Sequence, residues 1–174
     1  MATTFVVEDG TGLATANAYL EVADADQYHE NYGNPTSWSA AATADKQEAI
    51  RIATRYLDGA YSRRWAGYRG EKDQALDWPR RSAIDSDGWT RDSDSVPQEV
   101  KDACAVMALR VIDGESLLPD VSAADREVVQ ESATVGPISE SKTYLSTKGN
   151  YKRFSIVDAV LRPLLKRQGE RIRA

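Results

Sequence analysis

An acidic stretch, DSDGWTRDSDS, has the composition of a calcium-binding loop. Aspartates alternate there with serines and a glycine, at Asp85, Asp87, Asp92 and Asp94. Carboxylates so spaced suit Ca²⁺, but an EF-hand loop also needs a glutamate at its twelfth position. Counted from Asp85, that position is Val96. The pattern therefore favours a solvated acidic loop over a metal site.

Catalysis through histidine or cysteine would depend on His29 or Cys104, because the chain has one residue of each type. A multi-cysteine zinc site, a multi-histidine metal site and an internal disulfide are excluded. We interpret His29 as a partly exposed helical residue and Cys104 as a small core residue. The chain contains no phosphate-binding glycine loop, HExxH or GxSxG motif. The sequence makes no case for an enzyme, and we expect no cofactor.

Charge is divided unevenly along the chain, whose net charge is −5. Residues 148–174 hold eight basic and two acidic residues, a net +6, which leaves −11 for the first 147. A general nucleic-acid binder needs a basic face on its folded body. An acidic body with a basic C-terminus instead suits docking to an acidic partner. No segment approaches the ~20 apolar residues that span a bilayer, and no signal-peptide pattern occurs, so we expect synthesis in the cytoplasm and no membrane partner.

Hydrophobic spacing predicts a mainly α fold: a bundle of three to four helices with one β-hairpin excursion and a C-terminal helix plus basic tail. A length of 174 residues suits one domain. We divide it into an extended N-terminal arm (1–17), a helical core (18–118), the β excursion (119–150) and the C-terminal helix with its tail (151–174).

Three helices in the core are predicted from their apolar stripes and end signals. The first begins near Val22, with Ala25, Tyr28 and Tyr32 on one side. The second has Thr43 as its N-cap, Gly59 as its end, and a stripe of Ala49, Ile50, Ala53 and Leu57. Pro97 begins the third, whose stripe includes Val100, Cys104 and Met107. We expect Trp38, just before the second helix, to fold back onto it.

The last third of the chain changes pattern. Approximate alternation of β-branched and aromatic residues predicts two strands around a bend at Gly136 and Pro137, with Val129, Val135, Ile138 and Tyr144 as candidate contacts between subunits. Two strands alone are marginal in water, so we expect them to pair with something else. The C-terminal helix has an apolar face, interrupted by Pro163, made of Ile156, Val157, Val160, Leu161, Leu164 and Leu165.

Residues 62–95 form a long connection, and such connections are often functional. Its stretch QALDWPRRSAIDSDGW is rich in aromatic and basic residues. The candidate site residues in this connection are Trp65, Trp78, Pro79, Arg80 and Trp89. Packing of Trp78 over the junction of the two long helices, with Arg80 bound to helix carbonyls or carboxylates, is one interpretation. A rigid ledge for a neighbouring subunit is another. Stacking on nucleic acid is disfavoured by the many aspartates nearby.

Several segments in this order resemble one family of tailed-bacteriophage proteins. They are NAYLEVADADQYHENYG, AIRIATRYLDG, the W-x-G-x-R-G of Trp65–Gly70, QALDWPR, VPQEVKDACAVMAL, VVQESATVGPISESKTY and VDAVLRPLL. The family resembles head–tail connector, or head-completion, adaptors, although it is often labelled a DnaT-like single-stranded-DNA-binding family. The resemblance covers roughly residues 15–165.

The resemblance implies a structural protein in the virion neck. Its subunits would form a ring, expected to be a dodecamer, between the portal and a downstream neck or tail-completion protein, and genomic DNA would pass through without specific binding. The C-terminus would dock on the portal through Leu161, Arg162, Leu165, Lys166, Arg167, Arg171 and Arg173. The alternative function is single-stranded-DNA binding.

Overall fold

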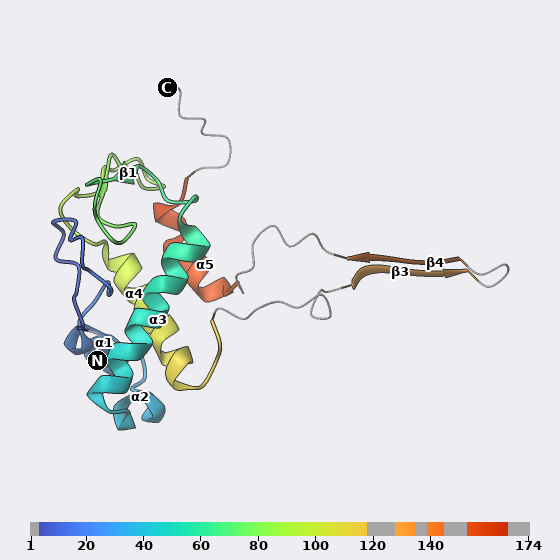
Figure 1. The fold of residues 1–174 in the computed structure, drawn as a ribbon, viewed down its shortest axis with the longest axis horizontal. Coiled ribbons are helices and arrows are strands. Elements are labelled where there is room, and N and C mark those ends of the chain that lie inside the picture. The colour runs from blue at the N-terminus through green and yellow to red at the C-terminus, as the bar shows by residue number, and fades with distance from the viewer. Residues whose placement is uncertain (1–3, 118–127, 135–138, 145–152, 167–174) are drawn as a thin grey trace. The chain divides into compact units, whose positions relative to one another are not determined.

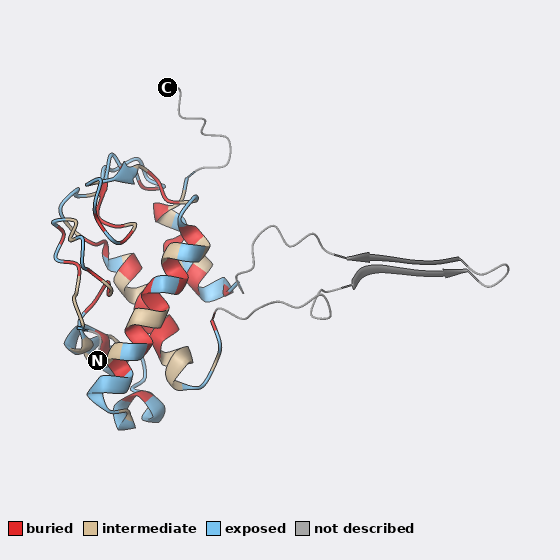
Figure 2. Cartoon of the chain, in the orientation of Figure 1, coloured by how far each residue is buried: buried red, intermediate tan, exposed pale blue. Residues whose placement is uncertain are grey.

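Helices α3 (Thr43–Tyr61) and α4 (Gln98–Ile112) pack against each other at the centre of the fold. The computed structural model describes residues 4–117, 128–134, 139–144 and 153–166 (Figure 1). The predicted stripe of α3 is buried, and Figure 2 shows buried residues along both helices. The Cys104 Sγ of α4 lies 3.5 Å from the Thr54 Oγ1 of α3. The core position of Cys104 is confirmed, and burial raises the pKa of its thiol to about 12.

The predicted ends of α3 are wrong by a few residues. Thr43 is already helical and Ala42 occupies the cap position, while the helix continues past Gly59 to Tyr61. A glycine near a helix end costs only about 1 kcal/mol. Tyr61 offsets that cost, because its side chain is buried and its hydroxyl donates to Asp158 Oδ1 at 2.9 Å. A tertiary contact therefore extends the last turn.

Two shorter helices, α1 (Val22–Asn31) and α2 (Thr36–Ala40), lie at the N-terminal end of α3 (Figure 1). Trp38 is buried, and Lys46 Nζ of α3 lies 5.3 Å from the centroid of its ring, in line with the predicted packing onto that helix. The Trp38 Nε1 donates to Asp26 Oδ1 at 2.7 Å, and Lys46 Nζ lies 2.9 Å from the same oxygen. Trp38 also changes the face that α1 buries, since its ring centroid lies 4.5 Å from that of His29. His29 is consequently buried, contrary to prediction, and Tyr32 is 71% exposed.

The C-terminal segment consists of α5 (Ser155–Leu161) followed by the 3₁₀ turn η2 (Arg162–Leu164). The predicted interruption at Pro163 is confirmed, because the α-helix changes there into the tighter turn. Val157, Leu161 and Leu164 are buried, whereas Ile156 is 51% exposed. The predicted apolar face was therefore too wide. Among the described residues, no helix has the length and hydrophobicity needed to cross a bilayer.

Strands β3 (Val128–Thr134) and β4 (Ser139–Tyr144) form the predicted antiparallel hairpin. The chain divides into two compact units, and the hairpin belongs to the second, Leu118–Lys152. The register places Glu131 opposite Lys142. No third strand joins β3 and β4 among the described residues.

The long connection contains one small strand pair, β1 (Tyr68–Arg69) with β2 (Arg80–Arg81), and is otherwise irregular. A buried polar cluster holds it against α3. The Tyr19 hydroxyl donates to Asp58 Oδ1 and accepts the backbone N–H groups of Asp77 and Trp78 at 3.1 and 3.3 Å. The N–H of Asp77 also lies 3.3 Å from Asp58 Oδ2. Burial, with the nearby charge of Asp77, raises the pKa of Asp58 to about 7.

The first testable consequence concerns Trp78, which is fully buried with its ring centroid 5.7 Å from that of Trp65. Trp78→Ala should lower the free energy of unfolding by roughly 3–5 kcal/mol, the usual cost of emptying a large aromatic site. Chemical denaturation measures this change in the free energy of unfolding. Trp89→Ala is the matched control, because Trp89 is 74% exposed and should change stability by less than about 0.5 kcal/mol. Equal effects from the two substitutions would contradict the packing role of Trp78.

The second concerns Asp58, whose folded-state pKa lies above its ordinary value of 3.8. Its contribution to stability is therefore present at low pH and is lost as the pH rises through about 7. Between about pH 5 and pH 8, the free energy of unfolding of the natural protein should fall by roughly 2–3 kcal/mol relative to that of Asp58→Asn. Urea denaturation at several pH values measures this difference. The comparison cancels the contribution of His29, whose pKa burial lowers. Parallel pH profiles would show that Asp58 is ionised in the folded protein throughout this range.

Candidate functional site

Four of the five candidate residues in the long connection are structural. Trp65, Trp78, Pro79 and Arg80 are buried, and only Trp89 is exposed. Arg80 was predicted to bind helix carbonyls or carboxylates, and among the described residues it binds neither. Its guanidinium donates to the carbonyl oxygens of Ala66, Gly67 and Asp77 at 2.7, 2.8 and 3.2 Å. These carbonyls all belong to the long connection, so Arg80 links its beginning, at Ala66 and Gly67, to the segment around Asp77.

Gln74 completes this internal network. Its Oε1 accepts the N–H of Glu71 at 2.8 Å, and its Nε2 donates to the carbonyls of Leu76 and Pro79 at 2.7 and 3.2 Å. Gly67 allows the two parts of the loop to approach closely, because a Cβ there would lie 2.3 Å from the Arg81 carbonyl oxygen. Its φ of +67° also favours glycine. These contacts give structural roles to Gln74 and Arg80 in QALDWPR and to Gly67 in W-x-G-x-R-G.

Asp85, the first carboxylate of the acidic stretch, binds backbone N–H groups of the same loop. Asp85 Oδ1 accepts the N–H groups of Trp89 and Asp87 at 2.9 and 3.0 Å, and these bonds lower its pKa. Its other oxygen lies 3.3 Å from Arg91 Nε. In the described part of the chain, no group of acidic, histidine or cysteine residues is arranged to hold a metal ion.

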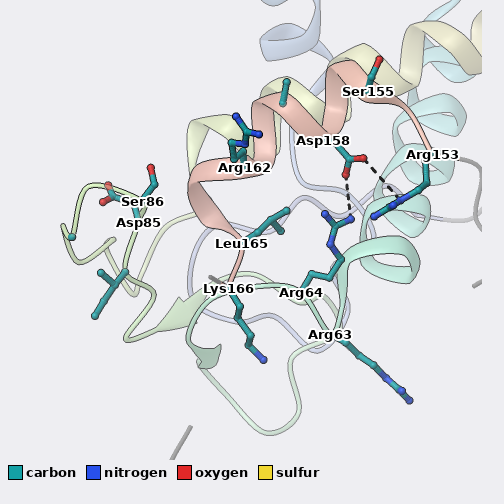
Figure 3. A pocket seen from close by; sticks show the side chains of 13 residues that line it. Arg63, Arg64, Asp85, Ser86, Arg153, Ser155, Asp158, Arg162, Leu165 and Lys166 are labelled. Atoms are coloured by element: carbon teal, nitrogen blue, oxygen red, sulfur yellow. Dashed lines mark hydrogen bonds and ion pairs between the residues drawn. The ribbon is translucent and has the colours of Figure 1, made fainter. Parts of the chain in front are cut away.

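A basic groove forms where the end of α3 meets the C-terminal segment. Backbone hydrogen bonds join them: Ala66 N–H donates to the Leu164 carbonyl at 2.9 Å, and Lys166 N–H donates to the Arg64 carbonyl at 2.7 Å. The groove has a volume of about 1060 Å³, with Ile84 and Leu165 among its apolar lining residues. Its cationic residues are Arg63, Arg64, Arg153, Arg162 and Lys166. Residues far apart in the sequence thus gather on one surface (Figure 3).

The groove contains more positive than negative charge. Asp158 Oδ1 lies 3.1 Å from Arg64 Nη1, and its Oδ2 lies 4.0 Å from Arg153 Nε, as the dashed lines in Figure 3 indicate. Arg63, Arg162 and Lys166 are exposed. Within the described ranges, none of these three forms an ion pair. The surface is therefore suited to an anionic partner.

The predicted portal-docking residues separate into three groups. Leu161 is fully buried and cannot contact a partner, because α5 packs that side chain into the core. Arg162, Leu165 and Lys166 line the basic groove. Arg167, Arg171 and Arg173 lie outside the described residues. Arg63 and Arg64 also line the groove but were not among the predicted site residues. Their only signal in the sequence was that two adjacent arginines follow the end of a predicted helix.

The candidate hairpin contacts are only partly described. Val129 lies at the register shift between Val128 and Gln130, and Tyr144 is in register with Val128. Val135 and Ile138 lie outside the described residues. The register shift indicates a β-bulge, a feature that bends a strand and locally increases its twist.

Residues 3–174 match the model of the family described as "Putative DnaT-like ssDNA binding protein". Comparison with curated proteins and with solved structures finds no match for the chain. The family match includes the groove, the long connection and the hairpin. Because it extends over almost the whole sequence, the chain belongs to this DnaT-like family.

Proposed function

We propose that this protein is a head-to-tail connector of a tailed-bacteriophage virion. Its subunits form a ring, a dodecamer in this proposal, beneath the portal in the neck. The ring extends the DNA channel and joins the head to a downstream neck or tail-completion protein. The observation that carries the proposal is the β3–β4 hairpin, which belongs to a compact unit separate from the helical one and has no further strand among the described residues.

The hairpin favours assembly for a physical reason. A two-stranded hairpin is marginally stable in water, and each of its outer edges presents backbone N–H and C=O groups that another strand can bind. Pairing with the hairpin of a neighbouring copy would satisfy these groups and bury both edges. A ring of identical subunits supplies such a neighbour on each side, so no subunit is left with a free edge.

The charge distribution supports a conduit for DNA. The first 147 residues carry −11, and a wall of that sign repels phosphate, so DNA can slide without adhering. The basic C-terminal tail supplies the opposite sign. In the proposal, Arg167, Arg171 and Arg173 of that tail bind acidic or carbonyl groups of the portal.

Deletion of residues 132–141 tests the connector function. Because this segment belongs to the second unit, the shortened chain should keep its helical circular dichroism and melting temperature. It should fail to form rings on purified portal, as measured by light scattering and electron microscopy. A matched variant replaces the same residues with glycine and serine, which keeps the chain length but removes the strands. Normal rings from either variant would contradict the role of the hairpin, and failure of the natural protein to bind portal would contradict the connector function.

Single-stranded-DNA binding is the second candidate, favoured by the basic groove and by the family description. Proteins of that kind combine a basic groove with aromatic side chains on which bases stack. The residues described as lining this groove include no aromatic side chain, and two of them, Asp85 and Asp158, are acidic. The described part of the groove therefore offers basic side chains but no aromatic surface on which bases could stack.

Binding to oligothymidine of about 20 nucleotides separates the two functions. Under the connector proposal, fluorescence anisotropy at physiological salt should detect binding no tighter than that of a control acidic protein. Sub-micromolar binding with a steep dependence on salt concentration would instead establish the second candidate.

A further inference from the structure

Among the described residues, the basic groove has positive charges without an ion-pair partner, and the other end of the helical unit has negative charges without one. An acidic end surrounds α1 and the start of α3, and it consists of Glu21, Asp24, Asp26, Glu30, Asp45 and Glu48. Lys46 is the only lysine or arginine between Glu21 and Glu48, and Asp26 pairs with it at 2.9 Å. The acidic end thus carries net negative charge.

Most of the acidic end is available to a partner. Glu21, Glu30, Asp45 and Glu48 are exposed, and within the described residues none of them pairs with a cation. Asp24 lies 3.9 Å from Lys101 Nζ at the edge of a small depression that Tyr28 and Tyr32 also line. The exposed ring of Tyr32 adds apolar area beside the carboxylates. Tyrosine and arginine are both enriched in protein interfaces.

The groove and the acidic end cannot meet within one molecule, because they lie at opposite ends of α3. Lys46 in the first turn contacts α1 through Asp26, whereas Arg63 and Arg64 follow the last turn. A helix of 19 residues is about 28 Å long at about 1.5 Å per residue. Their complementary charges can therefore pair only between two copies of the chain.

We propose that the basic groove binds the acidic end of a second copy of this chain. The contact is head-to-tail: each copy gives its groove to one neighbour and its acidic end to the other. Contacts of this kind generate closed rings when the rotation between neighbours closes. The inference rests on the proposed ring and names the surfaces that form it in the helical unit. Charge complementarity favours this occupant, and the absence of aromatic side chains among the described lining residues disfavours single-stranded DNA.

Paired charge reversal tests the contact. Arg162→Glu with Lys166→Glu reverses the net charge of the groove, and Asp24→Lys with Glu30→Lys reverses the net charge of α1 within the acidic end. Each pair alone should reduce ring formation on portal by at least about tenfold, because like charges then face each other. The four substitutions combined in one chain should restore rings. Arg55→Glu with Lys72→Glu is the matched control, since both residues are exposed, lie outside the groove and the acidic end, and change the net charge equally.

Each outcome has a distinct meaning, provided that circular dichroism and the melting temperature show the variants folded. Normal rings from both reversed pairs would overturn this contact while leaving the connector function intact. Loss without restoration in the combined variant would also overturn it, because the groove would then serve another partner. Oligothymidine binding that disappears on reversal of the groove would identify nucleic acid as the occupant.

Crosslinking tests the contact without the portal. Lys166→Cys and Glu30→Cys in one chain should give a ladder of disulfide-linked oligomers under mild oxidation, since the natural Cys104 is fully buried. Lys72→Cys with Glu30→Cys should remain monomeric. If portal rings never form but the ladder appears, the connector function fails and the contact stands. Absence of the ladder overturns the contact.

Discussion

The irregular connection between α3 and α4 can remain on the core only if its backbone polar groups find partners, and two buried side chains provide many of them. Arg80 donates to three carbonyls and Gln74 binds three further backbone groups. A segment without regular secondary structure would otherwise leave buried donors and acceptors unpaired, each at a cost of about 1–3 kcal/mol. In this connection, hydrogen bonds from the Arg80 and Gln74 side chains satisfy backbone groups that a helix or sheet would satisfy elsewhere, and the rest of the structure depends on them.

The basic groove is one result of this fastening. The N–H of Ala66 donates to the carbonyl of Leu164 one residue before Gly67, whose own carbonyl accepts from Arg80. The backbone that holds the C-terminal segment is therefore the same backbone that the loop network fixes. Arg63 and Arg64 keep their positions beside Arg162 and Lys166 because the chain after them cannot move away from the core. A stable scaffold of this kind is what charged side chains need to define a binding surface.

The long helices and the hairpin could be predicted because their patterns are local. The stripe of α3, the helix start at Pro97 and the strands around Gly136 and Pro137 each have signals within a few residues. The buried face of α1 could not be predicted, since it depends on Trp38 from α2. The groove was missed for the same reason: backbone bonds join residues about 100 positions apart. The hydrophobic periodicity of a sequence reflects local structure and does not indicate contacts between such distant residues.

The raised pKa of Asp58 has a calorimetric consequence. With a pKa of about 7, it binds a proton in the folded protein that it releases on unfolding in mildly acidic solution. The buffer takes up that proton, and the heat of its protonation adds to the heat of unfolding. The measured enthalpy therefore depends on the buffer, and unfolding in an amine buffer absorbs less heat than unfolding in phosphate at the same pH.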